Sequence, residues 1–244
     1  MNIFKNIFGR IWAFWGLLSF LVTFLIIFVP SMLSHLMKDP EGQKYFIAVS
    51  KIWMNVRLFL IACPVRVKGK ENFKKGEAYI VVFNHNAFLD VPLSAPYVPG
   101  ANKTIAKASF AKIPLFGQFY SRGSVLVDRS SERSRAKSFD LMKKVLASGM
   151  HMCIYPEGTR NRSQQPIKPF YDGAFKLSAA TGNKILPCVI IGTKKAMPIS
   201  KKFYLFPTRL QMHFLPAASP INRPVKELKE EVFNAMLTDY EKGA

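Results

Sequence analysis

The pattern of apolar and polar positions divides the chain near residue 62. An uncharged apolar run extends over the 19 residues from Ile11 to Val29. As a helix rising about 1.5 Å per residue, this run approaches the thickness of the hydrocarbon core of a bilayer. Trp12 and Trp15 stand near its start, where amphipathic rings favour the membrane–water boundary.

A second apolar segment follows a turn at residues 39–42. In residues 43–62, apolar side chains recur at helical spacing, with the cations Lys51 and Arg57 between them. The spacing predicts an amphipathic helix whose buried face includes Phe46, Trp53 and Val56. Residues 1–62 are therefore predicted to form a two-helix membrane anchor.

How this anchor meets the membrane is open at this stage. A cleaved signal peptide is disfavoured, because the apolar run is long and residues 31–34 make a poor cleavage site. A helix that crosses the bilayer and a hairpin that dips into one leaflet both fit the pattern.

From residue 63 onward, short apolar runs alternate with helical stretches. This alternation predicts one α/β domain over residues 63–244, with a central β-sheet flanked by helices. The expected strands are residues 79–83, 125–127, 153–155, 185–191 and 210–215. The expected helices are residues 131–148, residues 173–181 and a final helix that starts near Pro224. The predicted inner face of this final helix consists of Val225, Leu228, Val232, Met236 and Tyr240.

The net charge of the chain indicates which classes of partner it binds. Lys and Arg total 35 against 15 Asp and Glu, a formal net charge of +20. The surplus is spread over the chain, because residues 1–62 carry 6 basic and 2 acidic groups and the remainder carries 29 and 13. A basic body behind an apolar N-terminus favours an anionic membrane surface or phosphorylated substrates, although nucleic acid is also a polyanion.

The three cysteines argue against a metal or disulfide framework. Cys63, Cys153 and Cys188 are far apart and show no CxxC spacing. The expected state is therefore that of buried free thiols, and no metal site is predicted.

His85 and Asp90 are the first candidates for chemistry. They follow the apolar run 79–83 and are five residues apart, so on a continuous helix they would point in different directions. A strand end that turns into a helix can bring them together, with Asp90 at the helix N-cap. The carboxylate would then fix the imidazole tautomer and leave Nε2 to take a proton from a hydroxyl. The alternative is a capping Asp next to an unrelated loop His.

Two further strand ends carry charged residues. Residues 155–160 (YPEGTR) offer Glu157, a glycine that allows close backbone approach, and the phosphate-binding fork of Arg160. Residues 123–129 (GSVLVDR) end in Arg129. Ligands of open α/β sheets gather at the carboxyl ends of strands, so these residues suggest a phosphate-bearing substrate. An ordinary polar turn and a surface ion pair are the alternatives. The chain has no GxSxG motif, which favours direct transfer without a covalent intermediate.

At these residues the chain resembles the PlsC-type glycerolipid acyltransferase family. The likeness covers residues 65–215 and rests on NHNAFLD at 84–90, GSVLVDR at 123–129, PEGTR at 156–160 and a proline-containing apolar strand at 185–189. It implies a mixed central β-sheet of the glycerol-3-phosphate acyltransferase-like type. It also implies that His85 and Asp90 form the catalytic pair.

The resemblance implies substrates as well. The residues implied to bind them are Lys107, Arg129, Glu157, Gly158, Thr159 and Arg160. The implied acyl donor is acyl-CoA or an acyl carrier protein thioester, with no cofactor. The expected reaction acylates the free hydroxyl of 1-acylglycerol 3-phosphate at a membrane, from the cytoplasmic side, and gives phosphatidic acid. Two alternatives remain: another acceptor, such as glycerol 3-phosphate, another lysophospholipid or an aminolipid, and a basic membrane-tethered binding protein.

Overall fold

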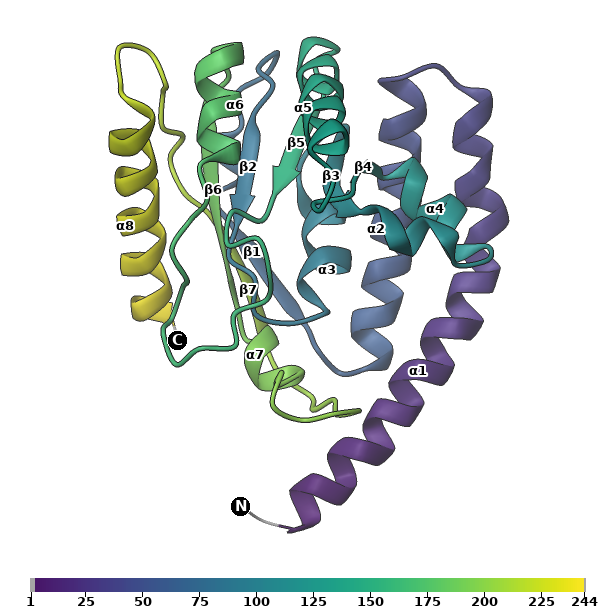
Figure 1. Ribbon diagram of the computed structural model, residues 1–244. Coiled ribbons are helices and arrows are strands. Elements are labelled where there is room, and N and C mark those ends of the chain that lie inside the picture. Colours follow the sequence, from purple (N-terminus) through teal and green to yellow (C-terminus); the bar gives the residue numbers. More distant parts are fainter. Residues whose placement is uncertain (1–2, 244) are drawn as a thin grey trace.

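A computed structural model describes residues 3–243, which form a seven-stranded sheet beside a long helical hairpin (Figure 1). The strand order is β1-β7-β6-β2-β5-β3-β4. All neighbouring strands are parallel except β6 and β7. The sheet is therefore mixed and flanked by helices, which confirms the predicted fold class.

The strands are β1 (Val65–Lys68), β2 (Ile80–Phe83), β3 (Asn102–Lys107), β4 (Ser124–Val127), β5 (His151–Ile154), β6 (Ile185–Ile191) and β7 (Leu210–Phe214). The α-helices are α1 (Ile3–Met32), α2 (Glu41–Leu60), α3 (Asp90–Tyr97), α4 (Phe116–Arg122), α5 (Glu132–Ala147), α6 (Gly173–Thr181), α7 (Thr193–Ala196) and α8 (Val225–Gly243). Short 3₁₀ turns are η1 (Leu33–Leu36), η2 (Lys70–Asn72) and η3 (Ala108–Lys112).

Burial separates the central strands from the edge strands. Every residue of β2, β5 and β6 is buried, as expected for parallel strands covered on both faces. The edge strands β1 and β4 alternate in exposure instead. The sequence prediction missed β1 and β3, because Arg, Lys and Asn interrupt their apolar residues.

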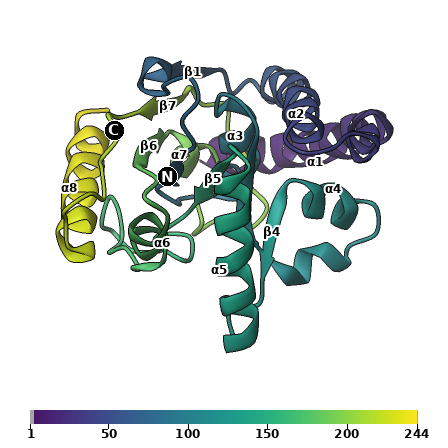
Figure 2. The same ribbon diagram turned by 90° about the horizontal axis from the view of Figure 1, so that it is seen from above.

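Two apolar cores lie on opposite faces of the sheet. Helices α5, α6 and α8 cover one face, and α2 and α3 cover the other (Figures 1 and 2). The predicted inner face of the final helix is confirmed, since Leu228, Val232, Met236 and Tyr240 are buried and Val225 is half-buried against the same core. Polar residues follow the carboxyl ends of the strands, between these two layers.

Polar contacts join α1 to α2. The indole N–H groups of Trp12 and Trp15 donate to the carbonyls of Ile61 and Leu60 at 3.0 and 2.8 Å. These carbonyls belong to the end of α2, where a helix leaves its last carbonyls without intrahelical partners. The two tryptophans expected at a membrane boundary therefore also cap the second helix.

Arg57 lies elsewhere than the amphipathic pattern indicated. It is buried between the two helices, and its guanidinium donates to the Gly16 carbonyl at 2.8 Å and to the Ser19 hydroxyl at 2.7 Å. Val56, expected on the buried face, is exposed. The cation turned inward because α1 offers it oxygen acceptors, which a helical-period analysis of α2 alone cannot include.

The outer face of α1 is apolar and exposed. By length and composition, the helix that extends from Ile3 through Leu36 could cross a membrane, and 22% of its most apolar window is buried in the protein. The exposed side chains of its middle include Leu18, Leu21, Val22, Leu25, Ile26 and Val29. Contiguous exposed apolar surface of this kind marks a lipid or protein contact.

A buried arginine fixes the tip of the hairpin to the sheet domain. Arg122, at the end of α4, donates to Asp39 at 2.7 Å, to the Gln43 side-chain carbonyl at 2.9 Å and to the Ser34 hydroxyl at 3.1 Å. Asp39 also pairs with Lys103 on β3 at 3.1 Å. Bidentate and networked pairs of this kind hold geometry better than isolated surface pairs.

Candidate active site

His85 and Asp90 meet in the loop between β2 and α3. The imidazole Nδ1 lies 2.9 Å from Asp90 Oδ2, and the Asp90 side chain is fully buried while that of His85 is 16% exposed. The same oxygen accepts the backbone N–H groups of Asn86 and Ala87 at 2.6 and 2.7 Å. Because Asp90 occupies Nδ1, Nε2 is the ring nitrogen left to accept a proton.

The expected N-cap role of Asp90 is wrong in detail. The cap position of α3 is Leu89, and Asp90 is the first residue inside the helix. Its carboxylate reaches back to the loop N–H groups that precede the helix. A carboxylate in the first turn is also favoured by the helix dipole. The pair therefore forms as predicted, through a tight loop and not through a cap.

Asn84 anchors this loop to the centre of the sheet. Its side-chain amide donates to the Ile190 carbonyl at 2.9 Å and accepts the Ile190 N–H at 2.7 Å. Both bonds are buried and join β2 to the end of β6. The sequence analysis assigned no role to Asn84, and only the pairing of β2 with β6 makes the role visible.

Glu157 braces the backbone of His85. One carboxylate oxygen accepts the His85 N–H at 2.6 Å, and the other accepts the Lys168 N–H at 3.1 Å. The Asn161 N–H also donates to the His85 carbonyl at 2.6 Å. Burial raises the pKa of the Glu157 carboxyl to about 7, although the two N–H donors and Lys168 oppose the rise. Sequence reasoning expected this carboxylate at the substrate, whereas its oxygens are bonded to backbone.

Replacing Glu157 by glutamine is expected to lower kcat about tenfold while the acceptor KM stays within twofold. A glutamine has one acceptor oxygen, so its NH₂ would face one of the two backbone donors and displace His85. Steady-state kinetics with the acceptor varied measure this split. Glu77→Gln, at an exposed carboxylate paired with Lys184, is the matched control. A large rise in acceptor KM would instead assign Glu157 to substrate binding.

The same residue predicts a pH dependence of stability. A carboxyl with a raised folded pKa binds its proton more tightly in the folded than in the unfolded chain. Its contribution to folding is greatest below the usual glutamate pKa and falls as the pH rises towards 7. As the pH is raised from 5 to 7, the free energy of unfolding should therefore fall less for Glu157→Gln than for the native protein. Denaturant unfolding in detergent measures this difference.

The loop after β5 carries one guanidinium group and binds a second one from the loop after β4. Arg129, after β4, donates through Nη1 to the Gly158 carbonyl. Arg160 stacks over the exposed ring of Phe88, with its guanidinium carbon 3.5 Å from the ring centre. Gly158 has a φ of +73°, at which any other residue would be strained, and a Cβ there would lie 2.7 Å from the Tyr171 ring.

Thr159 and Lys107 complete the set of predicted residues. Thr159 is exposed and accepts a hydrogen bond from Lys168 Nζ at 3.1 Å, so a third cation joins this loop beside Arg129 and Arg160. Lys107 ends β3 and is exposed. Because β5 separates β3 from β2, Lys107 starts about 10 Å from the strand of His85.

Tyr155 was not singled out by sequence, yet its ring lies against the imidazole. The ring centres of Tyr155 and His85 are 4.6 Å apart, and the buried Tyr155 hydroxyl lies 2.7 Å from the Ser94 hydroxyl. Burial raises the pKa of Tyr155 well above its usual value, so the phenol stays neutral. The tyrosine thus forms an uncharged wall beside His85.

The buried thiols are unsuited to nucleophilic catalysis. Burial raises the pKa of Cys153 to about 12 and also raises the pKa of Cys188, and the thiolate is the reactive form. Within residues 3–243, no three His, Cys, Asp or Glu side chains are grouped so that they could hold a metal ion. The geometry offers a base, its carboxylate partner and nearby cations.

Comparison with known families agrees with this geometry. The family described as Acyltransferase matches residues 64–191, the part of the chain that holds His85, Asp90, Arg129 and Glu157. The chain belongs to this acyltransferase family. The match begins just before β1 and ends with β6, so the long N-terminal hairpin lies outside it.

Curated relatives and one solved structure extend the comparison. A chloroplastic 1-acyl-sn-glycerol-3-phosphate acyltransferase of Arabidopsis thaliana is 29% identical over 74% of this chain and 49% of its own length. A 1-acyl-sn-glycerol-3-phosphate acyltransferase of Helicobacter pylori is 28% identical over 67% of this chain and 70% of its own. The chain spans about half the length of several curated relatives that it matches.

The fold has a close match among crystal structures. The 1-acyl-sn-glycerophosphate acyltransferase PlsC of Thermotoga maritima superposes with a TM-score of 0.81 and covers 98% of this chain and 97% of its own, at 23% identity. The superposition includes the hairpin as well as the sheet domain, because nearly the whole of both chains is covered.

Proposed function

We propose that this member of the acyltransferase family transfers a fatty acyl group from an acyl thioester to the free sn-2 hydroxyl of 1-acylglycerol 3-phosphate. The observation that carries the proposal is the His85–Asp90 pair, held at 2.9 Å at a strand end and bonded to the loop after β5, which carries Arg160 and binds Arg129. A base next to cations suits an acceptor in which a hydroxyl and a phosphate lie close together. The relatives named as 1-acyl-sn-glycerol-3-phosphate acyltransferases support this choice of acceptor.

The proposed reaction proceeds in one transfer step. His85 Nε2 removes the proton from the hydroxyl as its oxygen attacks the thioester carbonyl, and Asp90 stabilises the imidazolium that forms. The carbon–sulfur bond then breaks, an ester bond remains, and the proton passes from Nε2 to the departing thiolate. The products are phosphatidic acid and the free thiol of CoA or of an acyl carrier protein, so no cofactor is consumed.

The cations have separate proposed tasks. Arg129, Arg160 and the Thr159–Lys168 contact bind the acceptor phosphate, and Gly158 keeps the loop close enough to do so. Lys107 extends from β3 to donate to the oxyanion that develops on the thioester carbonyl. Glu157 acts on the acceptor through His85, whose backbone it holds.

The proposed acceptor, 1-acylglycerol 3-phosphate, and the proposed product, phosphatidic acid, both reside in a membrane. The exposed face of α1 is proposed to hold the protein there. The site then faces the cytoplasm, at the inner membrane of a bacterium or its equivalent, where anionic lipids attract a protein with a net charge of +20. No nucleic acid partner is proposed.

A panel of acceptors tests the proposal. The purified protein would receive 1-acylglycerol 3-phosphate, glycerol 3-phosphate, a lysophosphatidylcholine, an amino-acid-containing lysolipid and 1-acylglycerol, each with acyl-CoA and with acyl carrier protein thioesters. Mass spectrometry of the products should show phosphatidic acid, with kcat/KM for 1-acylglycerol 3-phosphate at least about tenfold above that for 1-acylglycerol, which lacks the phosphate. Preference for another acceptor would correct the substrate. Binding of DNA without any acyl transfer would support the binding-protein alternative.

A further inference from the structure

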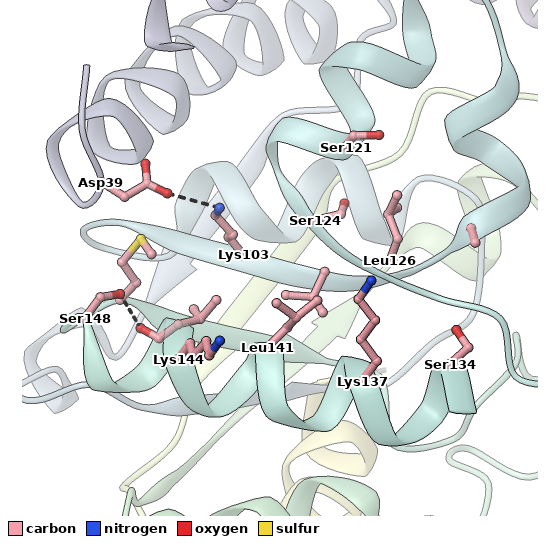
Figure 3. A pocket seen from close by; sticks show the side chains of 14 residues that line it. Asp39, Lys103, Ser121, Ser124, Leu126, Ser134, Lys137, Leu141, Lys144 and Ser148 are labelled. Atoms are coloured by element: carbon pink, nitrogen blue, oxygen red, sulfur yellow. Dashed lines mark hydrogen bonds and ion pairs between the residues drawn. The ribbon is translucent and has the colours of Figure 1, made fainter. Parts of the chain in front are cut away.

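A second polar site lies against β3 and β4, which β5 separates from the strand that precedes His85. A cavity of about 670 Å³ opens between β4, α5 and the tip of the α1–α2 hairpin (Figure 3). This volume falls within the range of small-molecule and cofactor sites. The residues that line it are Asp39, Lys103, Ala108, Ser121, Ser124, Val125, Leu126, Ser134, Lys137, Leu141, Lys144, Val145, Ser148 and Met150.

The lining of this cavity is cationic over an apolar floor. Asp39 is its one carboxylate, and both Arg122 and Lys103 already pair with Asp39. Lys137 and Lys144 form no ion pair among residues 3–243. They flank Leu141 on one face of α5, and Figure 3 shows Lys137 and Leu141 directed from the helix towards β4. Such a surface suits a ligand that carries negative charge on an organic body.

The cavity extends away from the reaction centre. Its near end includes Ala108, which follows Lys107 directly, and Ser134, in the first turn of α5 after Arg129. Its far end includes Ser148 and Met150, which lie between α5 and the start of β5, at the amino-terminal ends of the strands. From residue 134 to residue 148, a helix rising about 1.5 Å per residue covers about 21 Å.

The two substrates of the proposed reaction place their phosphates differently. In the acceptor, the phosphate sits next to the carbons that bear the reacting hydroxyl, so it must bind beside His85. In the donor, a pantetheine arm separates the thioester from its phosphates. This arm is about as long as five extended residues, or about 17 Å. The cations that bind the donor phosphates must therefore lie farther from the base than those that bind the acceptor phosphate, and the lysines of this cavity lie on α5, outside the loops that hold His85 and Arg160.

We propose that the cavity between β4 and α5 binds the phosphorylated end of the carrier that brings the acyl thioester. Lys137 and Lys144 contact its phosphates, and the pantetheine arm runs past Ser134 and Ala108 towards His85. The proposal rests on the proposed acyl transfer. The ligand chemistry is a phosphopantetheine thioester, whether on CoA or on a carrier protein.

Charge reversal at Lys144 tests this assignment against a neighbouring control. Lys144→Glu is expected to raise the donor KM about tenfold, with kcat and the acceptor KM within twofold, since a charge-assisted contact is lost. Lys137→Glu should act in the same direction, and Lys144→Arg should retain most of the native donor KM. The control is Lys143→Glu, an equal charge change at the adjacent residue, which pairs with Asp140.

Both donors are used so that their sources can be told apart. A rise in KM for palmitoyl-CoA alone assigns the lysines to nucleotide phosphates, and a rise for both donors assigns them to the shared phosphopantetheine. A rise in KM for the acyl carrier protein thioester alone assigns the lysines to the phosphopantetheine of the carrier protein. Equal effects of Lys143→Glu and Lys144→Glu, a change in acceptor KM only, or no change at all would overturn the proposal. Aggregation of Lys144→Glu together with a native donor KM would also overturn the proposal. In that case the lysines of α5 would serve only to protect the edge strand β4 from association.

Calorimetry separates this proposal from the proposed function. Coenzyme A itself is titrated into folded His85→Ala protein and into the same protein with Lys144→Glu added. A Kd for coenzyme A that is about tenfold higher in the double variant than in His85→Ala supports the site even if no acyl transfer is ever observed. Equal binding to both proteins overturns it for CoA even where transfer is intact.

Discussion

Replacing His85 by alanine is expected to lower kcat about 10³-fold, because the proposed base that takes the hydroxyl proton is removed. The effect should appear in kcat and kcat/KM alike, since the imidazole acts in the transition state and contributes little to ground-state binding. Acyl transfer from a radiolabelled thioester, measured on protein shown to be folded and bound to vesicles, checks this result.

A second histidine provides the matched control. His213 on β7 also contacts a carboxylate, with Nδ1 2.8 Å from Asp239 Oδ1, but this pair joins β7 to α8 and lies outside the loop between β2 and α3. His213→Ala should therefore keep kcat within twofold of the native value. Comparable losses in the two variants, or substantial activity in His85→Ala, would contradict the assignment of His85 as the base.

Replacing Asp90 by asparagine is expected to lower kcat about 10²-fold while the fold survives. In the native protein Oδ2 accepts three N–H groups, whereas Oδ1 is buried with no hydrogen-bond partner. An asparagine can place its oxygen at the Oδ2 position and its NH₂ at the vacant one. The loop and the histidine tautomer are then kept, and only the negative charge proposed to stabilise the imidazolium is lost.

Asp90→Ala separates the two contributions of the carboxylate. Alanine leaves the His85 ring and the two loop N–H groups without their acceptor, so both stability and kcat should fall. Thermal unfolding in detergent and kcat are measured for both variants. If Asp90→Asn unfolds as readily as Asp90→Ala, the charge is structural. If Asp90→Asn retains native kcat, charge stabilisation of the imidazolium is not needed.

The sequence was informative where a single element carries the signal. The runs that became β2 and β6 are apolar throughout, so their burial in the centre of the sheet was predicted from composition. The inner face of α8 followed from helical periodicity alone. The edge strand β1 gave no such signal, because its alternating Arg and Lys residues are compatible with a loop until β7 pairs with it.

The candidate site divides in the same way. His85, Asp90, Arg129 and Arg160 were singled out by residue type, since each stands at a strand end. The residues that hold them in place were not singled out, because their hydrogen bonds to backbone depend on which strands are neighbours in the sheet. The bracing of His85 by Glu157, 72 residues away, requires β2 and β5 to be neighbours.

The sequence by itself determined that this protein has an apolar N-terminal hairpin, a basic α/β domain and a His–Asp pair at a strand end. Local periodicity and residue chemistry suffice for these features, because they depend on neighbours along the chain. Only the tertiary structure decided that Arg57 turns inward, that Glu157 holds His85, and that unpaired lysines line a cavity beside β4. These features depend on strand order and helix packing, which bring together groups far apart in sequence and set which charges are neutralised.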